Sequence, residues 1–204
     1  MSTVLIAAVT ATVAPASASA VAVDDSPGLT VRAGGQEWTI EEFLELGDLG
    51  DQQSEATGGV SPLLLGPVDT LFCDTLNDAS HMIISYASEP DGDWPGGEVR
   101  LFCGTEQSSG YKHIRYRHQT DWTLKGESVG YFSSWDDLMD SMVWITLLST
   151  ADERLTVNQG SGKFCMTTPV QFYVGDAMVG TMDPRIVLSE NNMLVITAIP
   201  GGGC

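Results

Sequence analysis

The segment YKHIRYRHQ, residues 111–119, concentrates side chains that can move protons and hold negative charge. Five of its nine residues are cationic or can become so, namely Lys112, His113, Arg115, Arg117 and His118. The full chain of 204 residues has 9 lysines and arginines and 3 histidines against 27 aspartates and glutamates. In a chain with a formal net charge of −18, this density of cations marks the segment as a candidate site.

The residue types in the cluster suit cleavage of a phosphodiester bond. The reference pKa of histidine is about 6.5, so one histidine can take the proton from a ribose 2′-hydroxyl and a second can protonate the leaving 5′-oxygen. Lysine and arginine side chains stabilise the negative charge that develops on the pentavalent phosphate. Because the nucleophile belongs to the substrate, we expect neither a metal nor another cofactor.

Other chemistries fit the sequence less well. Zinc needs three or four ligands, and the third histidine, His81, lies 32 residues before His113. The HExxH motif of zinc proteases and the GxSxG motif of serine hydrolases are both absent from the sequence. The structural alternative is a surface cluster that only balances acidic neighbours, and the sequence leaves that alternative open.

The spacing of the histidines does not decide the local structure of the cluster. In an extended segment, His113, Arg115 and Arg117 share one face. In a helix, His113 and Arg117 are neighbours four positions apart, and Arg115 lies three positions before His118. Neither geometry brings the two histidines together, so we expect a bend in the chain if they act as one site.

The elements that must position the cluster are predicted to be helices followed by strands. Thr39 precedes a short helix with Glu41 and Glu42 in its first turn, and Gly47 ends it. A second helix follows Ser134, where apolar residues of WDDLMDSMVWITLL recur at three- and four-residue spacing that is typical of a core-facing face. Asp137 gives the start of this helix the form of a capping box with a shorter acid.

The last quarter of the chain is predicted to form short strands, in addition to the earlier segment HMIISYAS. The later segments are KFCMTT, VQFYVG, RIVLS and MLVITAIP, with Asn191 and Asn192 as turn residues. Short connections favour an antiparallel meander. The predicted fold class is therefore α+β, with N-terminal helices followed by a twisted antiparallel sheet.

The block GYKHIRYRHQTDW resembles the "KHI..RH" motif of the BECR-type ribonuclease toxins, a superfamily that groups barnase, EndoU, colicin nuclease and RelE-like domains. The likeness continues through the WDD helix to VITAIPGG, which is similar to the family's final strand, and it covers about residues 100–203. The resemblance implies a BECR-like fold and a metal-independent ribonuclease, often an exported toxin acting on tRNA or other RNA. A toxin of this kind would have an immunity protein as a partner.

The resemblance also assigns roles to individual residues. His113 and His118 fall on the two histidines of the motif, Lys112 belongs with them in the catalytic group, and Arg115 and Arg117 occupy substrate-binding positions. Thr197 matches the hydroxyl residue of the final strand, where a phosphate contact is expected. Two further substrate-binding candidates come from the strands between, Lys163 and Tyr173.

The N-terminal region has a different character. Residues 1–22 are typical of a secretory signal peptide, with an apolar run followed by Ala-x-Ala sites, although no lysine or arginine precedes the run. Residues 23–98 form an acidic region, and residues 99–204 the catalytic domain. No segment is long enough to span a bilayer. A solvated acidic surface is the simplest interpretation of this region. The hypothesis beside it is that the region folds against the basic cluster and masks it, through carboxylates that include Glu41, Glu42, Glu45, Asp48 and Asp51.

The four cysteines are widely spaced and even in number, which favours two disulfides in an oxidising compartment. Three connectivities are open, and we favour Cys73–Cys103 with Cys165–Cys204. Together these features predict a secreted endoribonuclease that uses histidine acid–base catalysis. A non-catalytic exported interaction module with a degenerate nuclease fold is the alternative function.

Overall fold

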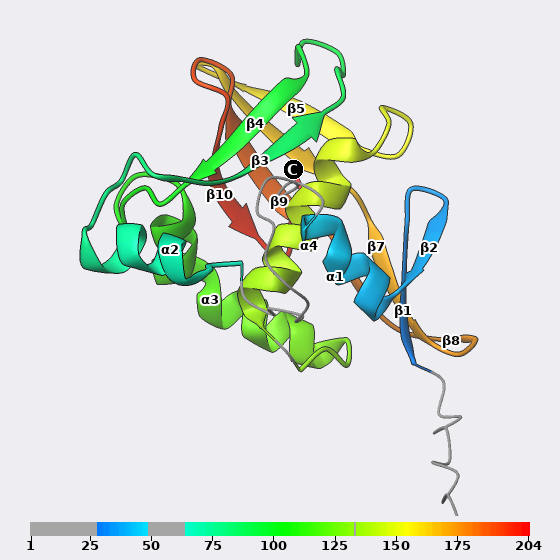
Figure 1. The fold of residues 1–204 in the computed structure, drawn as a ribbon. Coiled ribbons are helices and arrows are strands. Elements are labelled where there is room, and N and C mark those ends of the chain that lie inside the picture. The colour runs from blue at the N-terminus through cyan, green and yellow to red at the C-terminus, as the bar shows by residue number, and fades with distance from the viewer. Residues whose placement is uncertain (1–27, 49–63, 133) are drawn as a thin grey trace, which may run out of the picture.

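The computed structural model describes residues 28–48, 64–132 and 134–204. Two sheets and a layer of helices enclose one core (Figure 1), which confirms the predicted α+β class. The helical elements are α1 (Ile40–Asp48), α2 (Pro67–Thr70), the π-helical turn η2 (Leu71–Thr75), α3 (Tyr111–Ser128) and α4 (Trp135–Leu148). The strands are β1 (Leu29–Ala33), β2 (Gln36–Thr39), β3 (Met82–Ser88), β4 (Gly97–Phe102), β5 (Leu155–Gly160), β6 (Lys163–Thr167), β7 (Val170–Val174), β8 (Ala177–Met182), β9 (Arg185–Ser189) and β10 (Leu194–Ile199).

The larger sheet has six strands in the order β3-β4-β10-β9-β6-β5, and the smaller has four in the order β2-β1-β7-β8. The predicted meander is therefore only partly correct. The hairpin β7–β8 leaves the larger sheet and pairs with β1, where Val31 lies opposite Phe172. Pro169, just before β7, has no backbone N–H to donate to a neighbouring strand, so it cannot continue the hydrogen-bond pattern of the larger sheet. In addition, β10 meets β4 in parallel, with Leu194 opposite Arg100.

Helix α1 begins with the capping arrangement that the sequence predicts at Thr39. The Thr39 N–H donates to the Glu42 carboxylate at 2.9 Å, and the Glu42 N–H donates to the Thr39 hydroxyl at 3.2 Å. The helix ends at Asp48, one residue beyond Gly47. It packs against α4.

Helix α4 covers the predicted residues and is the central helix of the core. Its apolar face is fully buried, as the periodicity predicts, through Leu138, Met139, Met142 and Val143. The predicted capping box at its start is wrong, because the Ser134 hydroxyl donates to Asp136 and makes no bond to the helix backbone. Asp137 instead accepts a bond of 2.8 Å from the Leu64 N–H.

Both favoured disulfides are present. Cys73 of η2 is bonded to Cys103, directly after β4, and Cys165 of β6 is bonded to Cys204. The Cα–Cα distances are 5.2 and 5.8 Å, which are usual for a disulfide. The first bridge therefore fixes η2 beside the residues that lead into α3.

The elements of the acidic region and of residues 99–204 share both sheets. Strand β1 pairs with β7, β3 pairs with β4, and the boundary at residues 98 and 99 falls inside β4. The predicted signal peptide at residues 1–22 lies outside the described residues. Among the described helices, none has the length and apolar character needed to cross a membrane.

Candidate functional site

The basic cluster lies at the start of α3, so its structure is helical. Gly110, the residue before the helix, has φ 85°, a conformation that glycine adopts without strain. A Cβ at this position would lie 2.5 Å from the Phe102 carbonyl oxygen. The Gly110 N–H donates to the Ile196 carbonyl at 3.1 Å, and the Lys112 N–H donates to the Cys103 carbonyl at 2.9 Å. These contacts fix the start of the helix between the end of β4 and the middle of β10.

The buried face of α3 determines which cluster residues point outward. Tyr111, Ile114 and Trp122 are buried, and the Trp122 Nε1–H donates to the Ala198 carbonyl of β10 at 3.1 Å. The Tyr111 hydroxyl donates to Asp136 of α4 at 3.0 Å. Burial, and then the charge of Asp136, raise the pKa of Tyr111 well above its ordinary value, so the phenol stays protonated.

His113 and His118 lie close together on this helix. Their ring centroids are 6.3 Å apart and the rings meet edge to face, at 76°. The expected bend is wrong, because α3 is one α-helix through both residues and the side chains bring the rings together. Both rings are half-buried.

Each histidine is oriented through its Nδ1. The Nδ1 of His113 lies 3.0 Å from the Glu106 carbonyl oxygen, and that of His118 lies 3.2 Å from the Asp121 carboxylate. Because both partners only accept hydrogen bonds, each Nδ1 carries the proton. Within the described residues neither Nε2 has a hydrogen-bond partner. Both Nε2 atoms are therefore available to a substrate.

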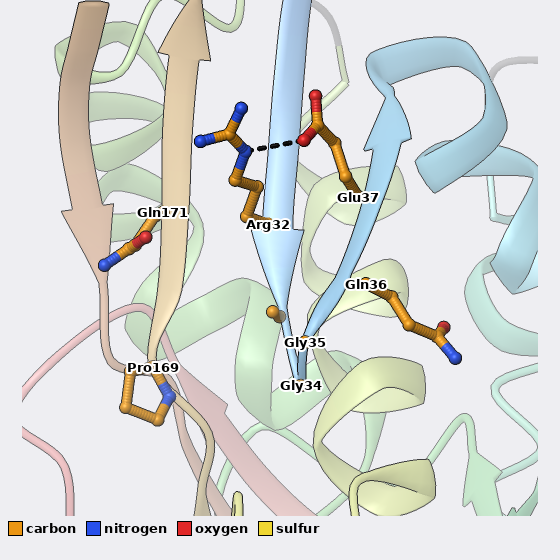
Figure 2. Close-up of a pocket in the computed structure, with 8 residues that line it drawn as sticks. Arg32, Gly34, Gly35, Gln36, Glu37, Pro169 and Gln171 are labelled. Carbon is orange, nitrogen blue, oxygen red and sulfur yellow. Dashed lines mark hydrogen bonds and ion pairs between the residues drawn. The ribbon is translucent and has the colours of Figure 1, made fainter. Parts of the chain in front are cut away.

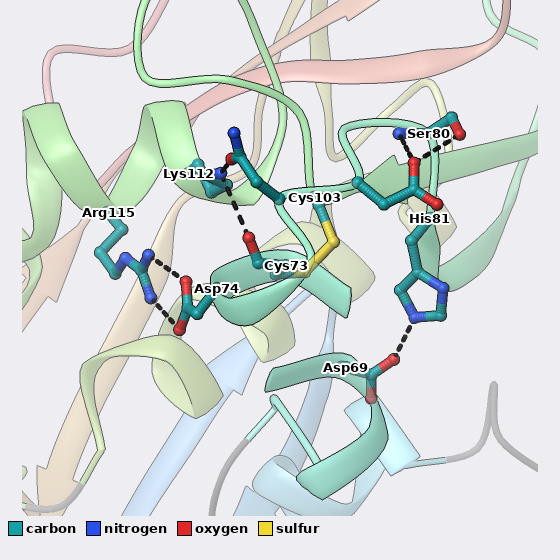
Figure 3. The surroundings of a disulfide bond; sticks show 10 residues. Asp69, Cys73, Asp74, Ser80, His81, Cys103, Lys112 and Arg115 are labelled. Carbon is teal, nitrogen blue, oxygen red and sulfur yellow. Dashed lines mark hydrogen bonds and ion pairs between the residues drawn. A yellow bond between two sulfur atoms is a disulfide. The ribbon is translucent and has the colours of Figure 1, made fainter. Parts of the chain in front are cut away.

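Two of the cluster cations are paired with residues 73–77, the segment that the Cys73–Cys103 disulfide anchors (Figure 3). Arg115 donates to both carboxylate oxygens of Asp74, at 2.6 and 3.1 Å. Lys112 Nζ donates to the Cys73 carbonyl at 3.2 Å and to the Asn77 side chain. The bond from Arg115 lowers the pKa of Asp74 below its ordinary value, so the carboxylate stays ionised.

The acidic region thus contacts the cluster, but through a different residue from those expected. Asp74 supplies the carboxylate, whereas Glu42 closes the capping arrangement of α1. Among the described residues, Glu41 and Glu45 form no ion pair with the cluster. Asp51 lies outside the described residues, as does the side chain of Asp48. The reason is packing, because α1 lies against α4 while η2 lies beside α3.

Thr197 lies in β10 between the two residues whose carbonyls bond to Gly110 and Trp122. The pairing register of β10 with β9 shifts between Val195 and Thr197. The Thr197 hydroxyl is buried and, within the described residues, has no hydrogen-bond partner. The residue is therefore on the strand that supports α3, but it makes no hydrogen bond to either histidine.

The other two candidates lie away from the cluster. Lys163 begins β6, opposite Ser189 of β9, and is exposed two strands away from β10. Tyr173 belongs to the smaller sheet, where the Arg32 guanidinium lies 4.0 Å above its ring. The structure does not bring Tyr173 to the histidines, because β7 pairs with β1 instead of continuing the larger sheet.

A pocket in the smaller sheet lies beside this last pair and does not include the cluster (Figure 2). It is formed by the β1–β2 turn and by the start of β7, with Gly34, Gly35 and Pro169 among its lining residues. Arg32 and Glu37 form an exposed ion pair of 2.7 Å at its side. Within the described residues no group of three or more His, Cys, Asp or Glu side chains is placed to hold a metal ion.

Sequence reasoning missed three residues of the site. Asp121 could have been found from its position three residues after His118, because residues three positions apart are neighbours on the surface of a helix. Asp74 could not, because it lies 41 residues from Arg115. Tyr116 lies inside the cluster, and its residue type alone could have marked it as a candidate. It is 62% exposed, and the Arg117 guanidinium lies 5.4 Å from the centroid of its ring.

Comparison with models of known protein families, with curated proteins and with solved structures finds no match to this chain.

Proposed function

We propose that this protein is a metal-independent endoribonuclease with a BECR-like site, in which His113 and His118 are the acid–base pair. The observation that supports the proposal is their geometry: the ring centroids are 6.3 Å apart, and both Nδ1 atoms are bound to fixed acceptors. Because the rings are this close, both Nε2 atoms can bond to the same phosphate group, through hydrogen bonds of about 2.7–3.2 Å.

In the proposed reaction, Nε2 of His113 takes the proton from the ribose 2′-hydroxyl. The 2′-oxygen attacks phosphorus, the bond from phosphorus to the 5′-oxygen breaks, and Nε2 of His118 donates its proton to that oxygen. The products are a 2′,3′-cyclic phosphate and a 5′-hydroxyl. His118 takes the acid role because the Asp121 carboxylate is in place as the counter-ion of an imidazolium.

Arg117 is the exposed cation of the cluster and is the proposed phosphate contact beside the histidines. Lys112 and Arg115 shape the site through η2, and reach a phosphate only by exchanging their present partners. The net charge of −18 opposes long-range attraction of RNA, so these contacts act only at close range.

The two disulfides fit a protein of an oxidising compartment, and we propose that it is secreted. In the toxin interpretation an immunity protein would be its partner.

The test is cleavage of total RNA by the full chain in EDTA. We expect cleavage that leaves cyclic phosphate ends, and a loss of roughly 10²- to 10⁴-fold in His113→Ala and in His118→Ala. The matched control is His81→Gln. His81 is the third histidine of the chain, and it lies outside the cluster with its Nε2 2.7 Å from the Asp69 carboxylate. Full activity in both alanine variants would overturn the assignment.

A non-catalytic interaction module is the second candidate, and one observation favours it. Both Lys112 and Arg115 already have protein partners, as expected of a cluster that stabilises the fold. This function predicts that intact protein binds a partner, and that it leaves RNA uncut at any ionic strength.

A further inference from the structure

Tyr116 differs from the other tyrosines of the chain in how its ring is placed. Tyr86, Tyr111 and Tyr131 are buried. Tyr173 is covered by Arg32, and its hydroxyl donates to Gln171 at 3.0 Å. Tyr116 is 62% exposed and, within the described residues, the one aromatic or cationic group in contact with its ring is the Arg117 guanidinium.

The position of Tyr116 relates it to the proposed site. It lies three residues after His113 in α3, and Arg117 lies four after, so both are surface neighbours of that histidine. Such neighbours have Cβ atoms about 5–6 Å apart. An exposed aromatic ring and a guanidinium therefore lie one helical turn from the histidine that is proposed to act on the 2′-hydroxyl.

An aromatic ring in this position suits one kind of ligand. Unpaired nucleobases stack on tyrosine rings and on arginine planes, whereas bases within a duplex are already stacked on their neighbours. The Arg117 guanidinium lies over the ring, 5.4 Å from its centroid, and adds a positive charge for a phosphate next to the stacked base. Ring and charge together match a nucleotide better than they match an apolar peptide.

We infer that Tyr116 stacks on an unpaired base next to the scissile phosphate, which makes single-stranded RNA the substrate class. The inference rests on the proposed nuclease site and adds its specificity. Tyr116 is a positioning residue in this scheme, since it touches the base and not the reacting atoms.

The test measures binding and cleavage separately with the full chain. Binding uses a 2′-O-methyl RNA dodecamer, single-stranded or as a blunt duplex, which cannot be cut because its 2′-oxygen carries no proton. We expect tighter binding of the single strand, and a loss of roughly 5- to 150-fold in Tyr116→Ala, the effect of one base–aromatic stack. Tyr116→Trp should keep the affinity, because it keeps a stacking surface.

Phe132→Ala is the matched control, since Phe132 is 79% exposed and lies outside α3. Equal affinity of Tyr116→Ala and wild type, with RNA still cut, would overturn the stacking inference and leave the nuclease standing. If Tyr116→Ala loses affinity but the wild-type protein leaves RNA uncut, the stacking inference stands and the nuclease proposal is overturned. An affinity lost equally in the control, or a preference for the duplex, would also overturn the inference.

Discussion

Arg115 of α3 and Asp74 of η2 form a two-pronged ion pair, with nitrogen–oxygen distances of 2.6 and 3.1 Å. The pair joins η2, in the acidic part of the chain, to the basic cluster. Because Cys73 next to Asp74 is bonded to Cys103, η2 cannot move far from α3. The pair engages Arg115, while Arg117 is exposed.

This ion pair makes stability depend on pH in the acid range. The bond from Arg115 lowers the pKa of Asp74 below 3.8, its ordinary value. A carboxyl with a lower pKa in the folded state stabilises the fold above its unfolded pKa, and that stabilisation is lost as the pH falls through the folded pKa. We expect Asp74→Asn to cost about 1 kcal/mol or less at neutral pH, since the pair is partly exposed, and less at a pH well below 3.8.

Urea unfolding at the two pH values measures this difference. Asp176→Asn is the control, because Asp176 is exposed in the β7–β8 turn and forms no ion pair among the described residues. An equal cost of Asp74→Asn at both pH values would contradict the linkage.

The same substitution should increase RNA binding if Asp74 masks the cluster. Removing the carboxylate charge releases Arg115 for a phosphate, and we expect a gain in affinity of up to about fivefold at neutral pH. Titration with the 2′-O-methyl single strand measures it. The double variant Asp74→Asn with Arg115→Gln should lose the gain, and a gain that persists there would rule out Arg115 as its source.

Asp121 is expected to position His118 through its Nδ1. In Asp121→Asn the amide can offer either its oxygen or its NH₂ group, so the ring tautomer is no longer fixed. We expect kcat to fall by roughly 10-fold or more while KM changes little, and the alkaline limb of the pH–rate profile, which reports the general acid, to move. A fall in stability with an unchanged pH profile would mean that Asp121 is only structural.

The two disulfides should differ in their effect on activity but not in their effect on stability. They close loops of similar length, 30 and 39 residues, so replacing either pair by serine should cost about 3–4 kcal/mol. Only loss of Cys73–Cys103 frees η2 from α3, so only that variant should alter RNA binding under conditions where both are folded. Equal binding by the two variants would show that η2 does not influence the cluster.

Local signals in the sequence were sufficient for some elements. The capping pair of Thr39 and Glu42 and the apolar face of α4 follow from residues a few positions apart. The even number of cysteines predicted two disulfides, but it left their connectivity open. The sequence could not predict which sheet β7 belongs to, because a short hairpin can join either sheet. The choice is fixed by β1, which pairs with β7 from the other end of the chain.

In the candidate site, too, the residue types could be read from the sequence, whereas the contacts between them could not. The histidines and their cations were found from residue type alone. Their closeness was not, because backbone geometry places residues five apart on different faces, and the side chains make the contact. The acceptor for His113 is a main-chain oxygen of Glu106, which any residue could supply. No pattern in the sequence could reveal it.

The pairing of β1 with β7 also has a consequence for the order of folding. Leu29 lies opposite Val174, so this contact joins positions 145 apart in the sequence (174 − 29). Contacts so distant in sequence form late, because loop-closure entropy must be overcome before they contribute. During synthesis, β1 emerges long before its partner and has only β2 to pair with. We expect the smaller sheet to be the last part of the molecule to become protected from hydrogen exchange.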